Sequence, residues 1–212
     1  MSLSDAPPPR AITVTGLTVR RGERTLFKGL DFVVPQGAVL AVRGANGAGK
    51  TTLLLVLAGI IRADAGRIDF AGRDPATVRP GADIHLFGHL PALKPRLTVA
   101  ENLRFWALVS GATGMSVGAA LGEVGLGAIA ALDAGYLSAG QSRRLALARL
   151  LVSLRPIWLL DEPTAALDAA GEALVGRLID RHRDGGGIVI AATHHDLMLG
   201  KAPESLTLGG PA

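Results

Sequence analysis

The sequence predicts an α/β fold with a mostly parallel sheet core, an N-terminal antiparallel β subdomain and an inserted helical subdomain. The parallel core is indicated by apolar runs without alternation, such as residues 157–160 and 188–192, which are separated by a helical pattern. The antiparallel part is indicated by residues 12–34, where apolar side chains recur at every second position. Helical spacing dominates from about residue 80 to 152, which predicts the inserted helical subdomain.

The first part of the chain is predicted to form the β subdomain and the first strand of the core. Residues 12–34 read as antiparallel strands around a turn at 21–24. A buried strand at 39–42 follows, and a glycine-rich loop then leads into a helix that includes residues 53–58. A further short strand is expected at 67–70.

The middle of the chain carries several helix start signals. Residues 84–87 read as one more strand, and Thr98 with Glu101 then provides the hydroxyl and carboxylate of a capping box. Ser116 and Ser138 are further N-cap candidates. Most of this region is therefore expected to be helical.

The turn between the strand at 39–42 and its helix carries the chemistry on which the functional prediction rests. Two glycines five positions apart, followed by Lys and Thr, fit the phosphate-binding loop pattern. Glycines let consecutive backbone N–H groups point at phosphates, and the helix start adds partial positive charge. We expect Lys50 to reach the β- and γ-phosphates and Thr51 to offer its hydroxyl to Mg²⁺. The predicted nucleotide-binding residues here are Gly44, Ala45, Asn46, Gly47, Ala48, Gly49, Lys50, Thr51 and Thr52.

A pair of carboxylates, Asp161 and Glu162, follows the strand at 157–160. Asp161 is expected to bind Mg²⁺ through its water shell, and Glu162 to act as general base on a water that attacks the γ-phosphate. His194 follows the next buried strand and is expected to hydrogen-bond the γ-phosphate, whereas His195 has no obvious task. Since ligands bind at the carboxyl ends of parallel strands, these groups should meet the phosphate loop. The predicted catalytic residues are Glu162, His194 and Lys50, and the predicted metal ligands are Thr51 and Asp161.

A third motif points to a family. The segment Leu137-Ser138-Ala139-Gly140-Gln141 resembles the signature sequence of ATP-binding cassette (ABC) ATPases, whose usual form is Leu-Ser-Gly-Gly-Gln. The resemblance implies a P-loop NTPase fold of ABC type that binds ATP and Mg²⁺. It also implies a head-to-tail homodimer in which Ser138, Ala139, Gly140 and Gln141 of one subunit face the γ-phosphate held by the other. Ala166-Leu167-Asp168 is similar to the family's D-loop, which implies a place for Asp168 near the bound nucleotide at the dimer seam.

The resemblance covers nearly the whole chain, and some segments suggest a subfamily. Residues 86–89, 101–103 and 137–150 resemble the haem-exporter ATPases of bacterial cytochrome c maturation. This implies an ATP-hydrolysing subunit that powers haem export from the cytoplasmic face of the inner membrane. Its implied partner is an integral membrane permease of the CcmB/CcmC type.

Two positions depart from the family pattern. The glutamine expected after the strand at 84–87 is replaced by Leu90, which cannot coordinate Mg²⁺ or position water, and His89 is the nearest substitute. The aromatic residue that normally stacks on adenine is replaced by Arg21, whose guanidinium can stack on a π face. Three arginines of the helix after Ser138 fit either a solvated face or contacts to nucleotide or a second subunit. They are Arg143, Arg144 and Arg149.

The composition of the chain excludes or disfavours several classes of protein. The 212 residues are 49% hydrophobic, but no segment approaches the 18 apolar residues of a membrane span. A net charge of +4 without a basic tail does not favour nucleic-acid binding, and the absence of cysteine excludes a disulfide framework. We expect residues 1–10 to be disordered and residues 11–212 to form one domain, with a helical subdomain at about 80–152.

Three functions therefore remain in competition. The first is a transport ATPase that dimerises around two ATP molecules and drives membrane partners, in the haem-handling system or another small exporter. The second is a regulatory subunit that binds ATP but hydrolyses it weakly, which Leu90 motivates. The third is an ABC protein acting on nucleic acid or ribosomes, which a single cassette without a basic tail disfavours.

Overall fold

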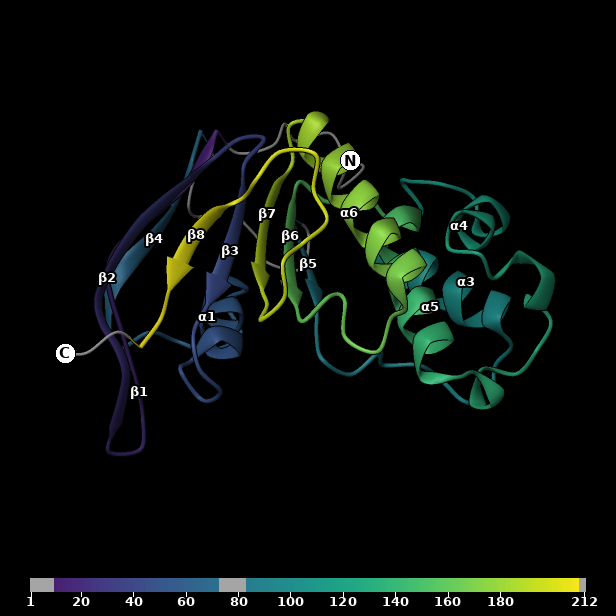
Figure 1. Ribbon diagram of the computed structural model, residues 1–212, viewed down its shortest axis with the longest axis horizontal. Helices are drawn as coiled ribbons and strands as arrows, with labels where there is room; N and C mark the ends of the chain where they lie inside the picture. The colour runs from purple at the N-terminus through teal and green to yellow at the C-terminus, as the bar shows by residue number, and fades with distance from the viewer. Residues whose placement is uncertain (1–9, 73–82, 210–212) are drawn as a thin grey trace.

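The computed structural model describes residues 10–72 and 83–209, so the expectation of disorder at residues 1–9 lies outside the described residues. Two β-sheets and a layer of helices stack side by side (Figure 1). The strands are β1 (Ala11–Arg21), β2 (Arg24–Pro35), β3 (Val39–Arg43), β4 (Ala65–Ala71), β5 (Ile84–Phe87), β6 (Ile157–Asp161), β7 (Ile188–Ala192) and β8 (Glu204–Thr207). The helices are α1 (Lys50–Leu57), α3 (Val99–Ser110), α4 (Val117–Glu123), α5 (Ala139–Val152) and α6 (Ala169–Asp184), with short 3₁₀ turns at Gly127–Ile129 and Ala134–Tyr136.

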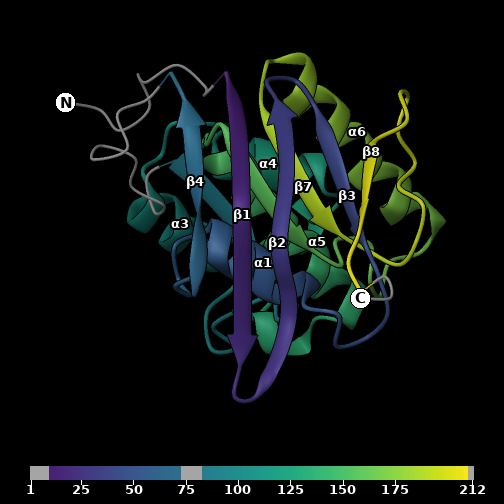
Figure 2. The same ribbon diagram turned by 90° about the vertical axis from the view of Figure 1, so that its left-hand side faces the viewer.

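The first sheet is antiparallel, in the order β2-β1-β4, and forms one outer face of the molecule (Figure 2). Apolar side chains at alternate positions of β1 are buried, among them Ile12 and Val14, which the period-two pattern predicts. The predicted strand at 67–70 is confirmed as β4 and pairs with β1.

The second sheet is parallel throughout, in the order β5-β6-β7-β3-β8. All five residues of both β6 and β7 are buried, because helices or the first sheet cover each face. The predicted α/β architecture with a parallel core and an N-terminal antiparallel sheet is therefore confirmed. The edge strand β8 was not predicted.

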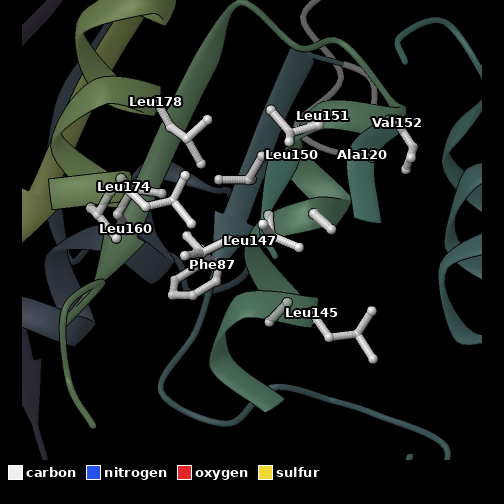
Figure 3. Close-up of a cluster of buried hydrophobic side chains, with 14 of the residues drawn as sticks. Phe87, Ala120, Leu145, Leu147, Leu150, Leu151, Val152, Leu160, Leu174 and Leu178 are labelled. Carbon is white, nitrogen blue, oxygen red and sulfur yellow. The ribbon is translucent and has the colours of Figure 1, made fainter. Parts of the chain in front are cut away.

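Apolar clusters on the two faces of the parallel sheet hold the layers together. Ile157, Leu159 and Ile190 point into the cluster that α1 and the antiparallel sheet share. Their neighbours Trp158 and Val189 point the other way, into a cluster with α3, α4, α5 and α6. Figure 3 shows this second cluster, in which side chains from β5, β6, α5 and α6 converge. Burial on both faces fixes the sheet and therefore the positions of the loops that leave it.

The predicted helix starts are also confirmed. Thr98 caps α3 with a complete capping box, and Ser138 does the same for α5 through Gln141. Ser116 caps α4, and Asp168 caps α6 by accepting the N–H of Gly171. These caps set where each helix begins, and two of them lie in segments singled out by motif.

Candidate functional site

The phosphate loop joins β3 to α1 and depends on glycine at two positions. Gly44 has φ +142°, and a Cβ there would lie 2.5 Å from the carbonyl oxygen of Leu208. Gly49 adopts a left-handed conformation with φ +98° and immediately precedes α1. Both conformations strongly favour glycine, because a side chain would be strained in either. The glycine spacing therefore has a direct structural cause.

Lys50 folds back over the loop that precedes it. Its Nζ donates to the carbonyl oxygens of Gly44 at 2.9 Å and Ala45 at 3.2 Å. It also lies 2.8 Å from Nε2 of His194, which must accept because the ammonium can only donate. Lys50 is thus a buried cation, 8% exposed, at the centre of the loop.

Thr51 and Asp161 connect the phosphate loop to the end of β6. The Thr51 hydroxyl donates to Oδ2 of Asp161 at 2.9 Å, across 110 positions of sequence. Asp161 is the last residue of β6 and is 6% exposed. The strands β3 and β6 are parallel, with β7 between them, so their carboxyl ends bring the two groups to the same edge of the sheet, as the sequence predicts.

Glu162 and His194 lie beside each other at the same edge. His194 Nε2 is 3.6 Å from Oε1 of Glu162, and the His194 backbone N–H donates to Oε2 at 3.4 Å. Glu162 has φ +46°, an uncommon conformation for a residue with a side chain. Lys50, His194 and Glu162 therefore form a short chain of polar contacts.

These groups line one cavity of about 550 Å³. It is polar and cationic along the loop, with two carboxylates at one end, which suits a phosphate chain with a divalent cation. Among the residues predicted for the site, the cavity is lined by Arg21, Asn46, Gly47, Gly49, Lys50, Thr51, Thr52, Asp161, Glu162 and His194.

Three further lining residues extend the sequence prediction: Arg24, Leu26 and His89. Arg24 begins β2, on the far side of the tight turn from Arg21, so both arginines border the same opening. In the sequence, only the cluster of Arg20, Arg21 and Arg24 could have indicated that Arg24 lines the site. His89 was named only as the nearest substitute for the missing glutamine.

The signature residues 138–141 do not line this cavity within the described chain. They form the first turn of α5, where Ser138 accepts the Gln141 N–H at 3.2 Å and Gln141 Oε1 accepts the Ser138 N–H at 2.9 Å. Ser138 and Ala139 are exposed. The predicted D-loop residue Asp168 also lies outside the cavity, where it pairs with Arg144 at 2.7 Å.

The three arginines of α5 turn out to have different surroundings. Arg143 is buried and donates to backbone carbonyls, while Arg149 lies 3.6 Å from the ring centroid of Trp106. Burial lowers the pKa of each guanidinium to about 10. The solvated-face interpretation is therefore wrong for Arg143, which is buried, while Arg149 is half-buried with its guanidinium over the Trp106 ring. Arg144 is partly exposed and paired.

Leu90 and His195 stay apart from the cavity. Leu90 is 77% exposed, so its side chain makes no wall of the site. His195 is exposed, and its backbone N–H donates to the Thr193 hydroxyl at 3.0 Å. In the described residues no helix is long and apolar enough to span a bilayer, and no three His, Cys, Asp or Glu side chains group as metal ligands.

Comparison with known families matches most of the chain. The family model for ABC transporters matches residues 27–165. The chain is 52% identical over 183 residues to the cytochrome c biogenesis ATP-binding export protein CcmA of Rhodopseudomonas palustris strain HaA2, covering 86% of this chain and 90% of the relative. It is 48% identical over 198 residues to the protein of the same name from Agrobacterium fabrum, covering 91% and 93%.

Solved structures share the fold at lower identity. An ABC transporter ATP-binding protein from Pyrococcus furiosus superposes with a TM-score of 0.80 at 22% identity, covering 93% of this chain and 97% of that one. The ADP conformation of MJ1267, an ATP-binding cassette of an ABC transporter, gives 0.74 at 22% identity, covering 96% and 88%.

Proposed function

Because the chain belongs to the ABC transporter family, we propose that it is the ATP-hydrolysing subunit of a membrane export complex that serves cytochrome c biogenesis. Relatives of about half-identical sequence carry that function in their names, and the match spans most of both chains. From the resemblance of residues 86–89 and 137–150, we further propose that the exported cargo is haem.

One observation carries the hydrolytic part of the proposal. The phosphate loop, Asp161 and Glu162 line the same cavity, and Thr51 is hydrogen-bonded to Asp161 at 2.9 Å. A triphosphate chain laid along the loop would therefore end beside both carboxylates.

The residues also fit Mg²⁺. One hydroxyl and one carboxylate oxygen, Thr51 Oγ1 and Asp161 Oδ2, already lie within a hydrogen bond of each other in a polar cavity. Mg²⁺ usually keeps several waters and takes only one or two protein oxygens beside those of the phosphates. When bound, it would neutralise charge on the phosphate oxygens.

The chain's own groups divide the remaining work. Lys50 leaves the Gly44 and Ala45 carbonyls to place its charge against the β- and γ-phosphates, and the α1 N-terminus adds backbone donors. Glu162 accepts a proton from the attacking water. The His194 backbone N–H donates to the Glu162 carboxylate, and once Lys50 has turned to the phosphates the His194 ring, in the tautomer protonated at Nε2, can donate to the γ-phosphate.

We also propose the assembly in which this site works. Two copies meet head to tail, and the Ser138, Ala139 and Gly140 segment of each covers the γ-phosphate of the other. The exposure of Ser138 and Ala139 at a helix start supports this proposal. The subunit is held at the cytoplasmic face of the membrane by a CcmB/CcmC-like permease. Strongly exposed apolar side chains in or beside the helical layer, Leu90, Leu108 and Tyr136, are candidates for that contact.

Steady-state ATP hydrolysis by the complex with its membrane partners tests the proposal. Lys50→Ala and Glu162→Gln should each lower kcat about 100-fold or more, as expected when a charge clamp or general base is lost. His194→Ala should also lower it, whereas the matched change of its exposed neighbour, His195→Ala, should leave the parent rate. In cells, Lys50→Ala should abolish haem attachment to c-type cytochromes. Hydrolysis by Glu162→Gln at the parent rate would show that the base is another group.

A second candidate is a regulatory subunit that binds ATP and hydrolyses it weakly. Leu90 favours it, because this residue replaces the family's glutamine and its exposed side chain does not line the cavity. In that case the assembled complex would bind ATP without consuming it. Measuring phosphate release beside nucleotide binding in the same preparation separates the two functions.

A further inference from the structure

We propose that Arg143 is a positioning residue that holds the catalytic carboxylate of Glu162 in place, an inference that rests on the proposed function. Arg143 lies in the second turn of α5 and is 4% exposed. One terminal nitrogen donates to the carbonyl oxygens of Gly88 at 2.9 Å and His89 at 3.0 Å. The other donates to the carbonyl oxygens of Asp161 at 2.7 Å and Glu162.

The backbone of Glu162 needs such support. Its φ of +46° is strained for a residue with a Cβ, and strain of this kind persists only where neighbouring groups impose it. The Glu162 N–H donates to Ala192 of β7 at 2.8 Å, and its carbonyl oxygen accepts from Ala165 at 3.1 Å as well as from Arg143. Without Arg143, the peptide after Glu162 loses its one side-chain donor. The side chain would then lose its fixed direction into the cavity.

The same guanidinium joins two walls of the cavity. His89 lines one wall and Asp161 with Glu162 another, and Arg143 reaches the first across 54 positions of sequence and the second across 18 and 19. All four hydrogens on the terminal nitrogens are used, two for each wall. Arginine suits this task because its donors form a rigid planar fork, whereas a lysine ammonium has three donors on a single atom.

The surroundings keep Arg143 charged and fixed. Its guanidinium lies 4.1 Å from the centroid of the Phe87 ring, which covers it from β5. Burial lowers its pKa to about 10, and the nearby charges of Asp161 and Glu162 oppose that shift. The group therefore stays protonated near neutral pH. It bonds to the backbone carbonyl oxygens of Asp161 and Glu162 rather than to their carboxylates, which remain free for nucleotide chemistry.

Kinetics of Arg143→Lys and Arg143→Met in the complex with its membrane partners test this role. Both variants should lower kcat for ATP about 10- to 100-fold, the scale expected for misplacement of a catalytic group by about an ångström. The KM for ATP should change less than about twofold, because the phosphate loop is untouched. Arg149→Met is the matched control: it removes a half-buried arginine of α5 that stacks on Trp106 and donates to the Pro91 carbonyl oxygen, and that has no hydrogen bond to His89, Asp161 or Glu162. It should reduce thermal stability comparably and keep kcat near the parent value.

A double variant separates positioning from general damage. If Arg143 acts through Glu162, Arg143→Met should cause no further loss of kcat in a Glu162→Gln background. The proposal is overturned if Arg143→Met keeps the parent kcat, or if it lowers the residual rate of Glu162→Gln by the same factor as the parent rate. Arg143→Lys supplies the same comparison if the Met variant does not fold. Failure of the proposed function looks different, since Glu162→Gln itself would then hydrolyse ATP like the parent.

Discussion

At the scale of single residues, strained backbone gathers near the signature and carboxylate segments. Among the described residues, three that are not glycine have clearly positive φ, namely Ala92, Glu162 and Ala166. Glu162 follows β6, and Ala166 belongs to the turn before α6, where its carbonyl oxygen would lie 3.1 Å from a Cβ on Gly140. The start of α5 therefore approaches this turn closely. A side chain larger than glycine at 140 would need that turn to move.

Two histidines away from the cavity are expected to make stability depend on pH. Burial lowers the pKa of His182, which stacks on Trp158 with ring centroids 4.0 Å apart, to about 4. Burial also lowers the pKa of His85 to about 4, where Nε2 bonds the Ser153 carbonyl oxygen. In the unfolded chain both titrate near 6.5, so the unfolded state binds more protons between these values. Their contribution to stability is present above about pH 6.5 and is lost as pH falls toward 4.

We therefore expect the free energy of unfolding to drop by about 2 kcal/mol per histidine between about pH 7 and pH 5. His182→Phe keeps a ring against Trp158 but cannot titrate, so its stability should fall less over the same range. Denaturant unfolding at several pH values measures this. The exposed His195, changed to Phe, is the control and should follow the parent. Identical pH dependence in His182→Phe and the parent would contradict the assignment.

The sequence predicted individual roles where motif and position coincide and failed where they do not. Lys50, Thr51 and Asp161 come together because strand ends in a parallel sheet must share an edge. The sequence left the role of Arg143 open between two interpretations, because α5 is buried on nearly every side and its arginines fit no amphipathic pattern. Arg24 was missed because a hairpin turn gives no indication of which ligand it faces.

At the scale of elements, α3 and α5 begin in the same way. Each has a complete capping box, Thr98 with Glu101 and Ser138 with Gln141. The two boxes should contribute similarly to stability, since each satisfies two N–H groups that the helix leaves unpaired. Only the Ser138 box lies in the segment proposed to face a second copy's nucleotide.

This similarity gives a matched pair of variants. Ser138→Ala and Thr98→Ala should each lower the free energy of unfolding by about 1 kcal/mol. Only Ser138→Ala should also lower ATP hydrolysis, by about tenfold or more, because it removes a hydroxyl from the proposed composite site. Chemical denaturation and steady-state turnover measure the two effects separately. If both variants lost equal activity, Ser138 would serve as a helix cap alone.

Strand β8 shows what local pattern could not predict at this scale. Its four residues, Glu204–Thr207, hold only one apolar side chain, and the strand lies at an edge of the sheet. Parallel pairing with β3 places the Leu208 carbonyl oxygen against Gly44. A strand specified by pairing with a distant neighbour rather than by its own periodicity is invisible to sequence patterns. Its consequence nevertheless reaches the first glycine of the phosphate loop.

At the scale of the whole molecule, the cavity is half of the proposed site. Its lining comes from the two sheets, the phosphate loop and the segment after β5, while the start of α5 is exposed and contributes nothing to it within one chain. In the proposed assembly, a second copy brings Ser138, Ala139 and Gly140 over the γ-phosphate. The dimer should therefore form when ATP is bound and persist only until the γ-phosphate is hydrolysed.

Glu162→Gln is the variant in which this dependence should be visible. With ATP and Mg²⁺ bound and hydrolysis blocked, the interface keeps its γ-phosphate, so the purified chain should shift from monomer to dimer. Because ADP lacks the group that the second copy would contact, it should leave the same variant monomeric. Size-exclusion chromatography with light scattering measures the mass in each state.

Ser138→Arg in the Glu162→Gln background should prevent the shift, since a bulky side chain would occupy the place of the phosphate contact, while Thr98→Arg at the other capping box should not. A dimer that forms equally with ADP would mean that the two copies associate through a surface unrelated to the nucleotide.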